Sequence, residues 1–402
     1  MSEPRTVAVV GAGLAGAKAV EVLRAEGYGG RIVLFGDEPH RPYERPPLSK
    51  GYLQGNDERD TVFVHPENWY GEHDVDLRLG TEVTGLDRHA HELMTAGGQP
   101  VRYDRLLLAT GASPRHLRLP HADLPGVHYL RNLDDSDALR AAFRPGANVV
   151  VIGAGWIGLE TAAAARTAGA TVTVLESAEL PLLRVLGPQM AQVFAGLHRE
   201  NGVDLRLGVE VAGLRADGST VTGVELGDGA VVDADAVVVG IGVAPNVDLA
   251  RSAGLDVDNG VLVDASLRTS DPHVFAAGDI ANAEHPVLRR RIRVEHWANA
   301  LHQPEVAAQS ILGKDAVYDR LPYFFTDQYD LGMEYVGHAP TYQKVVFRGD
   351  VAKREFTAFW LDSEDRVLAG MNVNVWDVTD RIQDLILAGE PADAFELPAP
   401  SA

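Results

Sequence analysis

The chain begins with a short apolar run, a glycine-rich turn and a stretch with helical spacing of apolar residues. Residues Thr6 to Val10 are apolar and rich in valine, which favours a β-strand. Ala15 to Ala25 places apolar side chains at the spacing of a helix, and Arg31 to Phe35 is a second apolar run. This order predicts a βαβ unit with parallel strands.

The same pattern recurs about 140 residues later. Asn148 to Ile152 predicts a strand, Leu159 to Ala168 an alanine-rich helix, and Thr171 to Leu175 a second strand. Two such units predict an α/β fold with two Rossmann-like dinucleotide-binding domains.

Other segments predict β-structure between and after these units. Val101 to Ala109 is predicted as one strand, and residues 203–240 and 261–277 alternate short apolar runs with glycine and aspartate turns. From about residue 321 the sequence becomes aromatic and β-rich, which predicts a C-terminal α+β domain with a helix at Thr379 to Ala388. The expected domains are a discontinuous first domain, an inserted second domain and a C-terminal domain, at residues 1–112 with 245–320, 113–244 and 321–402 respectively.

Composition excludes several classes of function. The 402 residues include 57 acidic and 36 basic side chains, for a formal net charge of −21, which disfavours nucleic acid as a partner. There is no cysteine, so the chain can form no disulfide, thiol nucleophile or cysteine-ligated iron–sulfur cluster. His89, His91 and Glu92 lie close together without a second cluster at metal-ligand spacing, so we expect no metal site.

Uncharged runs near the glycine turns are short. Val7 to Ala17 and Val149 to Leu159 fall well below the roughly 20 residues that cross a bilayer. The N-terminus leads directly into the first glycine turn, with no small-residue cleavage site before it. We therefore expect a cytoplasmic protein without a membrane partner.

The first glycine turn has the spacing of a dinucleotide-binding loop. Gly11, Gly13 and Gly16 match G-x-G-x-x-G between the predicted strand and helix, and Asp37 follows Gly16 by 21 residues. Glycines let backbone amides approach a pyrophosphate at a helix N-terminus, and the acid can accept hydrogen bonds from a ribose. The alternative is a tight turn that holds no ligand.

The second turn repeats this pattern with Gly153, Gly155 and Gly158, and Ile157 occupies the variable position before the last glycine. Glu176 follows Gly158 by 18 residues. A carboxylate favours a free ribose 2′-hydroxyl and repels a 2′-phosphate, so this site favours NADH over NADPH. Glu176 could instead be a solvated acid at the end of its strand.

The two sites are expected to hold different cofactors, because an enzyme gains little from two nicotinamides. We assign FAD to the first site, where Gly278 and Asp279 after the apolar run Val274 to Ala277 can contact the cofactor's hydroxyls. A plain surface turn is the alternative. No histidine or cysteine lies in a flavinylation motif, so the FAD is expected to be non-covalent.

Together these motifs resemble a known family over nearly the whole chain. The segments are Gly11 to Gly16, Arg45 to Lys50, Leu108 to Gly111 with Pro114 and Arg115, Val151 to Glu160, Gly242 to Asn246, Phe275 to Asp279 and Glu295 to Trp297. They resemble the FAD-dependent NADH:ferredoxin reductases of bacterial oxygenase systems, of the putidaredoxin reductase kind, within the glutathione-reductase-like superfamily. Relatives that use dithiol chemistry are excluded by the absence of cysteine.

The resemblance implies roles for individual residues. Contacts to FAD are implied for Ala15, Asp37, Arg45, Lys50, Val83, Arg131, Asp279 and Trp297. Contacts to NADH are implied for Glu160, Glu176, Arg184 and Gly242. Lys50 and Glu160 are the expected catalytic pair, with a cation near flavin N5 and a carboxylate that anchors the carboxamide.

One position departs from this family. Phe325 stands where many relatives have tryptophan, so an indole role beside the flavin is in doubt, and we expect the phenyl ring to pack there instead.

The implied reaction is hydride transfer from NADH to FAD, followed by single-electron transfer to a small iron–sulfur ferredoxin that feeds an oxygenase. A rubredoxin or monodehydroascorbate-type reductase, and a redox-responsive flavoprotein of the apoptosis-inducing-factor type, remain alternatives. Ferredoxins are usually acidic, so docking needs a local basic cluster on this acidic chain. The candidates lie together at Arg289, Arg290, Arg291 and Arg293.

Overall fold

The computed structural model describes residues 4–395 and divides the chain into two compact units. Each unit is built from three separate segments of the chain. The first comprises Met1–Glu44, Asp60–Ser113 and Ala244–Phe324, and the second comprises Arg45–Arg59, Pro114–Val243 and Phe325–Ala402.

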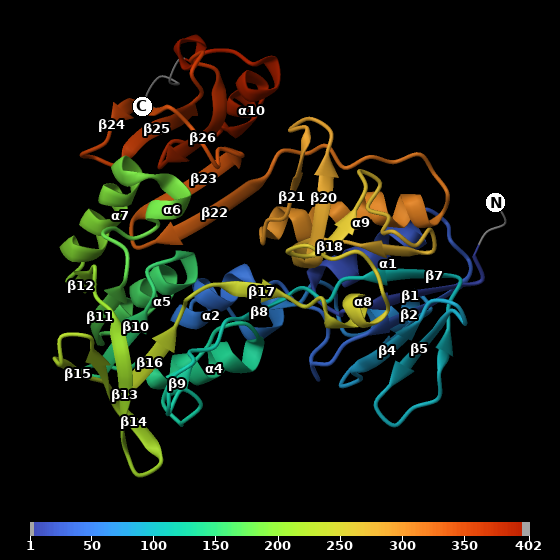
Figure 1. Cartoon of the computed structure of the whole chain (residues 1–402), viewed down its shortest axis with the longest axis horizontal. Coiled ribbons are helices and arrows are strands. Elements are labelled where there is room, and N and C mark those ends of the chain that lie inside the picture. The colour runs from blue at the N-terminus through green and yellow to red at the C-terminus, as the bar shows by residue number, and fades with distance from the viewer. Residues whose placement is uncertain (1–3, 396–402) are drawn as a thin grey trace. The chain divides into compact units, whose positions relative to one another are not determined.

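A parallel five-stranded sheet forms the centre of the first unit (Figure 1). All of its strands except the edge strand Val75–Arg78 are largely apolar and buried, as expected for a parallel sheet covered on both faces. Helix α1 (Leu14–Ala25) packs against α9 (Trp297–Ile311). In spatial order the strands are β19 (Val274–Ala276), β7 (Arg105–Leu108), β1 (Thr6–Val10), β2 (Arg31–Phe35) and β3 (Val75–Arg78).

Two smaller sheets complete this unit. One is antiparallel and contains β4 (Val83–Asp87), β5 (Glu92–Thr95) and β6 (Val101–Arg102). The other contains β18 (Val261–Val263), β20 (Ala281–His285) and β21 (Arg290–Ile292). The remaining helices are η2 (Arg59–Val62), α3 (Trp69–Glu72), α8 (Asp248–Ser252) and η3 (Gly278–Ile280), and short strands β8 (Ala112–Pro114) and β17 (Val243–Pro245) lie where the chain passes between the units.

The prediction of one strand over Val101 to Ala109 is wrong, because the segment forms β6 and β7 in two different sheets. The chain turns between them at Asp104, whose carboxylate accepts hydrogen bonds from the backbone amides of Arg5 and Thr6 at 2.9 and 2.8 Å.

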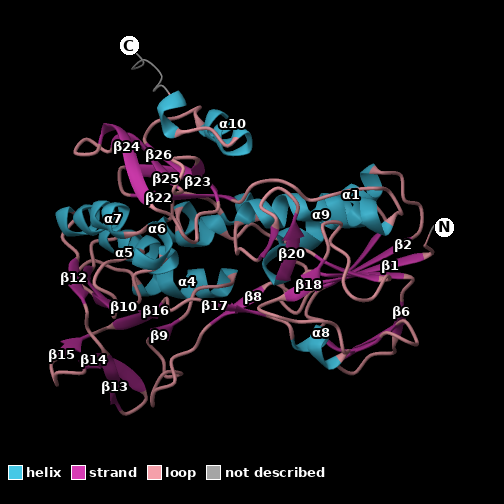
Figure 2. Ribbon diagram, turned by 45° about the horizontal axis from the view of Figure 1, so that its top comes forward, coloured by secondary structure: helices cyan, strands magenta, loops and turns pink. Residues whose placement is uncertain are grey.

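The second unit contains another parallel five-stranded sheet. Its strands are, in order, β12 (Asp204–Leu207), β11 (Thr171–Glu176), β10 (Asn148–Ile152), β16 (Ala236–Val239) and β9 (Val127–His128). Helix α5 (Trp156–Thr167) packs on β10, β11 and β16, and α7 (Pro188–Glu200) packs on β12 (Figure 2). Strands β13 (Val211–Asp217), β14 (Thr220–Leu226) and β15 (Val231–Asp233) form an antiparallel sheet, and helices α4 (Leu133–Ala142) and α6 (Leu183–Leu186) complete this part.

Segment Arg45–Arg59 belongs to the second unit although its neighbours in sequence belong to the first. It contains η1 (Pro46–Ser49) and α2 (Gly51–Gln54), which pack against α4 and α5. The hydroxyl of Ser136 on α4 donates to the carbonyl of Leu48 at 2.9 Å. Burial and a hydrogen bond to Asp137 raise the pKa of Tyr52 in the same segment.

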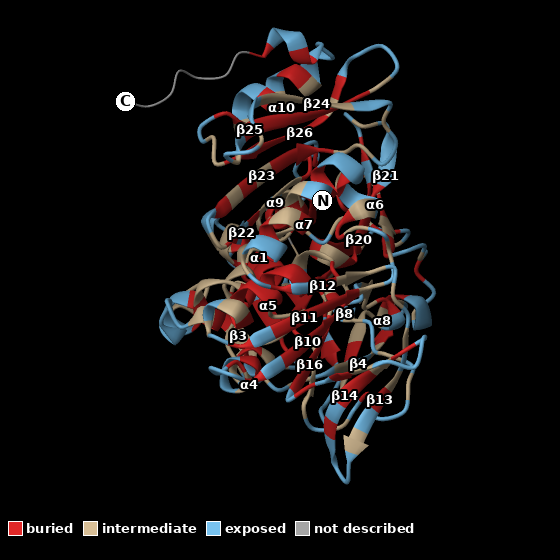
Figure 3. Ribbon diagram, turned by 90° about the vertical axis from the view of Figure 1, so that its left-hand side faces the viewer, coloured by how far each residue is buried: buried red, intermediate tan, exposed pale blue. Residues whose placement is uncertain are grey.

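The C-terminal part is an antiparallel sheet with a helix, and the three middle strands of the sheet are largely buried (Figure 3). The order is β22 (Tyr323–Gln328), β23 (Leu331–Gly337), β26 (Val367–Val373), β25 (Glu355–Leu361) and β24 (Lys344–Asp350). Helix α10 (Thr379–Ala388) packs on β23 and β26, and η4 (Ala392–Ala394) follows it. The predicted fold class is confirmed: two Rossmann-like α/β parts and a C-terminal α+β part.

Candidate functional site

The first glycine turn is shaped by two close backbone approaches. Gly11 has a φ of +114°, and a Cβ there would lie 2.1 Å from the carbonyl oxygen of Ala109. A Cβ on Gly16 would lie 2.0 Å from the carbonyl oxygen of Gly11. At Gly13 a Cβ would meet no atom within 4 Å, so its missing side chain leaves open space at the start of α1.

The second turn repeats this geometry. Gly153 has a φ of +100°, and its Cβ would lie 2.5 Å from the carbonyl oxygen of Gly240. A Cβ on Gly158 would lie 2.0 Å from the carbonyl oxygen of Gly153. The middle glycine, Gly155, again has no neighbour closer than 3.9 Å. In both turns the outer glycines satisfy packing, whereas the middle one leaves room for a ligand.

Both helices that follow these turns begin without a side-chain cap. Gly13 and Gly155 are the N-cap residues of α1 and α5, and neither helix has an acidic residue in its first turn. Helix α4, by contrast, begins with a capping box formed by Asn132 and Asp135. The open N-termini of α1 and α5 fit a pyrophosphate, which amides and the helix dipole attract.

The acids of the two turns occupy different positions. Glu176 accepts hydrogen bonds from the backbone amides of Ala154 and Ala178, at 2.7 and 2.9 Å. The amide of Gly153 bonds to Leu175 as that of Gly11 bonds to Phe35, so the residue equivalent to Glu176 is Gly36. Asp37 is one residue further on and exposed.

Other predicted FAD contacts lie in the first unit, around α1 and α9. A Cβ on Gly278 would lie 3.2 Å from the Cβ of Ala15, which brings η3 and its Asp279 beside the start of α1. Trp297 is the first residue of α9, and its indole donates to Glu44 at 2.8 Å. Val83 is the first residue of β4 and half-buried.

Further predicted contacts lie in the second unit. The Arg45 guanidinium donates to the carbonyl oxygen of Arg131, so these two residues lie together. Gly242 has a φ of +98° and its carbonyl accepts from the amide of Arg115 at 2.9 Å. Arg184 is exposed on α6, and Ile157 is 41% exposed in the first turn of α5.

Lys50 and Glu160 form a buried ion pair within the second unit. The Lys50 ammonium lies 2.7 Å from Oε1 of Glu160, and the two side chains are 14% and 4% exposed. The ammonium also lies 5.4 Å from the centroid of the Phe325 ring, as a cation–π contact. Segment Arg45–Arg59 and helix α5 therefore bring the two residues of the predicted pair together through contacts within the protein.

Two hydroxyls that the sequence analysis did not single out also donate hydrogen bonds to the Glu160 carboxylate. Ser49 donates to Oε2 of Glu160, and Thr326 donates to Oε1 at 2.5 Å. Both hydroxyl-bearing residues are buried. Ser49 precedes Lys50 directly, which is a weak hint, but Thr326 is distant in sequence and has no motif of its own.

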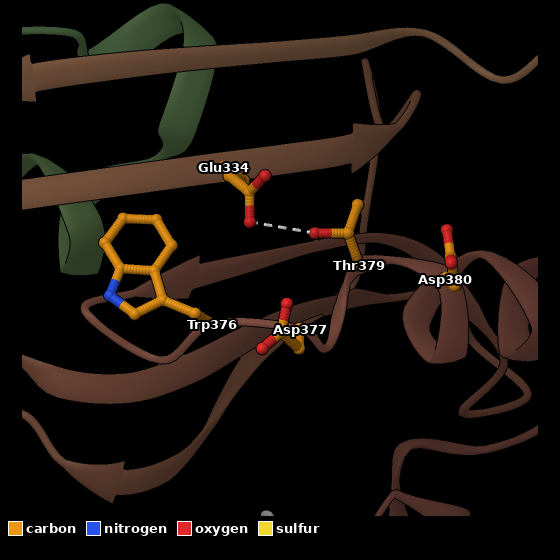
Figure 4. Close-up of a pocket in the computed structure, with 5 residues that line it drawn as sticks. All are labelled: Glu334, Trp376, Asp377, Thr379 and Asp380. Atoms are coloured by element: carbon orange, nitrogen blue, oxygen red, sulfur yellow. Dashed lines mark hydrogen bonds between the residues drawn. The ribbon is translucent and has the colours of Figure 1, made fainter.

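A cavity of about 310 Å³ lies in the C-terminal part and is lined by Glu334, Trp376, Asp377, Thr379 and Asp380 (Figure 4). Oε2 of Glu334 accepts from the hydroxyl of Thr379 at 3.0 Å. Three carboxylates repel a phosphate, so this cavity does not fit a dinucleotide. It contains none of the predicted site residues.

Within residues 4–395 no group of three or more histidine, aspartate and glutamate side chains is arranged to hold a metal ion. In the same part of the chain no helix combines the length and apolar character needed to span a bilayer.

Comparison with known proteins identifies two family models. One, described as pyridine nucleotide-disulphide oxidoreductase, matches residues 5–303, and one described as reductase C-terminal matches residues 323–402. The chain is 41% identical over 396 residues to the ferredoxin–NAD(+) reductase component of the anthranilate 1,2-dioxygenase system of Burkholderia cepacia, covering 98% of this chain and 97% of that protein.

Two further matches have a similar extent. Putidaredoxin reductase of Pseudomonas putida is 38% identical over 379 residues, which make up 93% of this chain and 90% of that protein. A crystal structure of the covalent putidaredoxin reductase–putidaredoxin complex superposes with a TM-score of 0.94 at 37% identity, covering 97% of this chain and 94% of that one.

The two kinds of glycine in the second turn give a matched test. Gly158→Ala places a methyl group against the backbone of Gly153, so we expect a loss of about 1–3 kcal/mol in the free energy of unfolding. The methyl group of Gly155→Ala meets open space, so the free energy of unfolding should change by less than about 0.5 kcal/mol. The same methyl group occupies the space left for the ligand, so the affinity for NAD+ should fall. Urea unfolding and calorimetric titration with NAD+ measure both effects. Equal losses of stability in the two variants would contradict this division of roles.

Proposed function

Because the chain belongs to the pyridine nucleotide-disulphide oxidoreductase family and is a ferredoxin–NAD(+) reductase, we propose that it passes electrons from NADH through FAD to a small iron–sulfur ferredoxin of an oxygenase system. The observation that carries this proposal is the buried Lys50–Glu160 pair, in a chain with two open glycine turns. In the proposed organisation, residues 1–112 and 245–320 bind FAD, residues 113–244 bind NADH, and residues 321–402 form the third domain.

The first turn suits non-covalent FAD. Gly13 leaves space at the uncapped N-terminus of α1 for the pyrophosphate. Asp37 is exposed, so its carboxylate can accept hydrogen bonds from ribose hydroxyls. Ala15 and Gly278 approach each other closely enough to set Asp279 beside the same helix start. FAD, when bound, accepts a hydride and releases electrons one at a time, which links NADH to a one-electron acceptor.

The second turn suits NADH. Gly155 leaves space at the N-terminus of α5, and Glu176 is held at the end of β11 by two backbone amides. A 2′-phosphate would meet this fixed carboxylate with like charge, whereas a 2′-hydroxyl can donate to it.

Lys50 and Glu160 are the proposed catalytic pair. The Lys50 ammonium stabilises the negative charge that arrives with a hydride, and Glu160 keeps the ammonium in place. A carboxylate offers about four acceptor positions, and Lys50, Thr326 and Ser49 occupy three of them. The remaining position, on Oε2, is available to a carboxamide N–H of the nicotinamide.

The arginine cluster supplies the proposed docking surface for ferredoxin, but its four members differ. The Arg293 side chain is 8% exposed and pairs with Glu295 at 2.6 Å, so it is unsuited to docking. Arg291 pairs with Glu284 at 3.3 Å and donates to two backbone carbonyls, which fixes it on the surface of its sheet. Arg289 and Arg290 are exposed and, unlike Arg291 and Arg293, have no acidic partner among residues 4–395.

Four basic side chains of the C-terminal part, Lys344, Arg348, Lys353 and Arg354, are less suitable because each of these four already has an acidic partner. The pairs are Lys344 with Asp365, Arg348 with Asp393, Lys353 with Asp350, and Arg354 with Glu200 and Asp330. On a chain with a net charge of −21, unneutralised arginines at Arg289 and Arg290 offer the better local contact for an acidic ferredoxin.

Cofactor choice can be tested at Glu176. The wild-type protein should prefer NADH over NADPH by tenfold or more in kcat/KM, since each 1.4 kcal/mol is worth about tenfold. Glu176→Ala removes the like charge and should narrow this ratio. Steady-state kinetics with both nucleotides measure it. An unchanged ratio of kcat/KM for NADH and NADPH in the variant would show that residues other than Glu176 select the nucleotide.

The role of Lys50 can be tested by Lys50→Met, which keeps the length of the side chain and removes its charge. We expect FAD to remain bound while its reduction by NADH slows by roughly tenfold or more, because one charge interaction is lost. Stopped-flow absorbance follows the reduction, and Lys344→Met is a control for losing a distant charge. Reduction at the wild-type rate would exclude a catalytic role for Lys50.

Docking can be tested by Arg289→Glu combined with Arg290→Glu. We expect a several-fold higher KM for an acidic two-iron ferredoxin and a weaker dependence on salt, while NADH still reduces the flavin normally. The matched control is Lys344→Glu with Arg348→Glu, which reverses two charges that are already paired. A similar rise in KM for both double variants would show that net charge, not this surface, controls docking.

A further inference from the structure

A line of buried hydrogen bonds connects α7 to the carboxylate of Glu160. His198 Nε2 lies 2.9 Å from Oε1 of Gln328, and Nε2 of Gln328 donates to the hydroxyl oxygen of Thr326 at 3.1 Å. Thr326 then donates to Oε1 of Glu160 at 2.5 Å. All four residues belong to the second unit and are at most 4% exposed.

The chemistry of the groups fixes the direction of every hydrogen bond in this line. An ionised Glu160 paired with Lys50 can only accept, so the Thr326 hydroxyl must donate to it. The oxygen of Thr326 is then left to accept from the amide N–H of Gln328. This orientation turns the carbonyl of Gln328 toward His198, so the imidazole must carry its proton on Nε2.

His198 is suited to a fixed, neutral state. Burial lowers the pKa of His198 to about 4, so the ring is uncharged near neutral pH. Within residues 4–395 its Nδ1 has no hydrogen-bond partner. A proton on Nδ1 would therefore add a buried N–H without an acceptor, which is costly. Geometry and burial both select the Nε2–H tautomer.

We propose that Thr326, Gln328 and His198 are positioning residues that orient the Glu160 carboxylate toward Lys50 and leave a single acceptor position for the nicotinamide carboxamide. The donors all point toward the carboxylate, so each hydrogen bond strengthens the next. This inference rests on the proposed hydride transfer at Lys50 and Glu160, and it assigns to β22 and α7 a role in that step.

The decisive variant is Thr326→Val, which keeps the side-chain shape and removes the hydroxyl. We expect reduction of the bound flavin by NADH to slow by about tenfold, the effect of losing one hydrogen bond to a charged group. Thr326→Ser keeps the donor and should restore the rate to within about twofold. A wild-type rate in Thr326→Val, or an equal loss in Thr326→Ser, would overturn the proposal.

A double variant separates positioning from a general structural effect. In a Glu160→Ala background the line has no carboxylate to orient, so adding Thr326→Val should cause no further slowing. An equal fold-loss in both backgrounds would show that Thr326 acts independently of Glu160 and would overturn the proposal.

The tautomer of His198 gives a readout that does not depend on activity. Nitrogen NMR of the holoenzyme with labelled histidine, assigned with His198→Gln, should show Nε2 protonated and Nδ1 unprotonated down to pH 6. A proton on Nδ1, or titration of this ring near 6.5, would overturn the proposal. If NADH failed to reduce the flavin of the wild-type protein, the proposed function would fail, whereas the tautomer would still decide whether the line of hydrogen bonds exists.

Discussion

Burying the charge of Glu160 is the constraint on which the arrangement of the second unit depends. A carboxylate that is 4% exposed loses its hydration, and the loss is offset only when donors occupy its lone pairs. The chain supplies these donors from two segments far apart in sequence, Lys50 and Ser49 before the sheet and Thr326 after it. Breaking any one contact leaves a buried charge less well compensated, so these segments are bound to α5 by electrostatics as well as packing.

This constraint explains why segment Arg45–Arg59 leaves the unit of its neighbours in sequence. Its polar side chains find partners on α4 and α5, as Tyr52 and Arg59 do on Asp137 at 2.5 Å. Composition and periodicity predicted no element in this stretch. The family resemblance identified Lys50 in it, but the hydroxyls that share Glu160 with Lys50 emerge only from the tertiary structure.

The sequence predicted most of the fold where local rules decide it. Strands Thr6–Val10, Arg31–Phe35 and Asn148–Ile152 were predicted with their observed limits, because apolar runs rich in β-branched residues that end at a glycine leave few alternatives. The prediction of a single strand over Val101 to Ala109 failed, because the strand is interrupted at Asp104. The carboxylate of Asp104 accepts hydrogen bonds from the backbone amides of Arg5 and Thr6. The sequence also failed to distinguish Arg293 from the neighbouring arginines, because its burial beside Glu295 depends on the tertiary structure.

The two glycine turns show how one backbone design can be fitted to different ligands. Their outer glycines make the same close approaches, so the backbone geometry is common to both. They differ at the equivalent position where the second strand ends, which holds Glu176 in one turn and Gly36 in the other. A Cβ on Gly36 would lie 2.6 Å from the Cβ of Ala12, so the first turn has no room there for a glutamate and its acid moves on to Asp37. The proposed ribose acceptor is thus held against the backbone in one turn and exposed in the other. This physical difference between the turns is consistent with two cofactors rather than two copies of one.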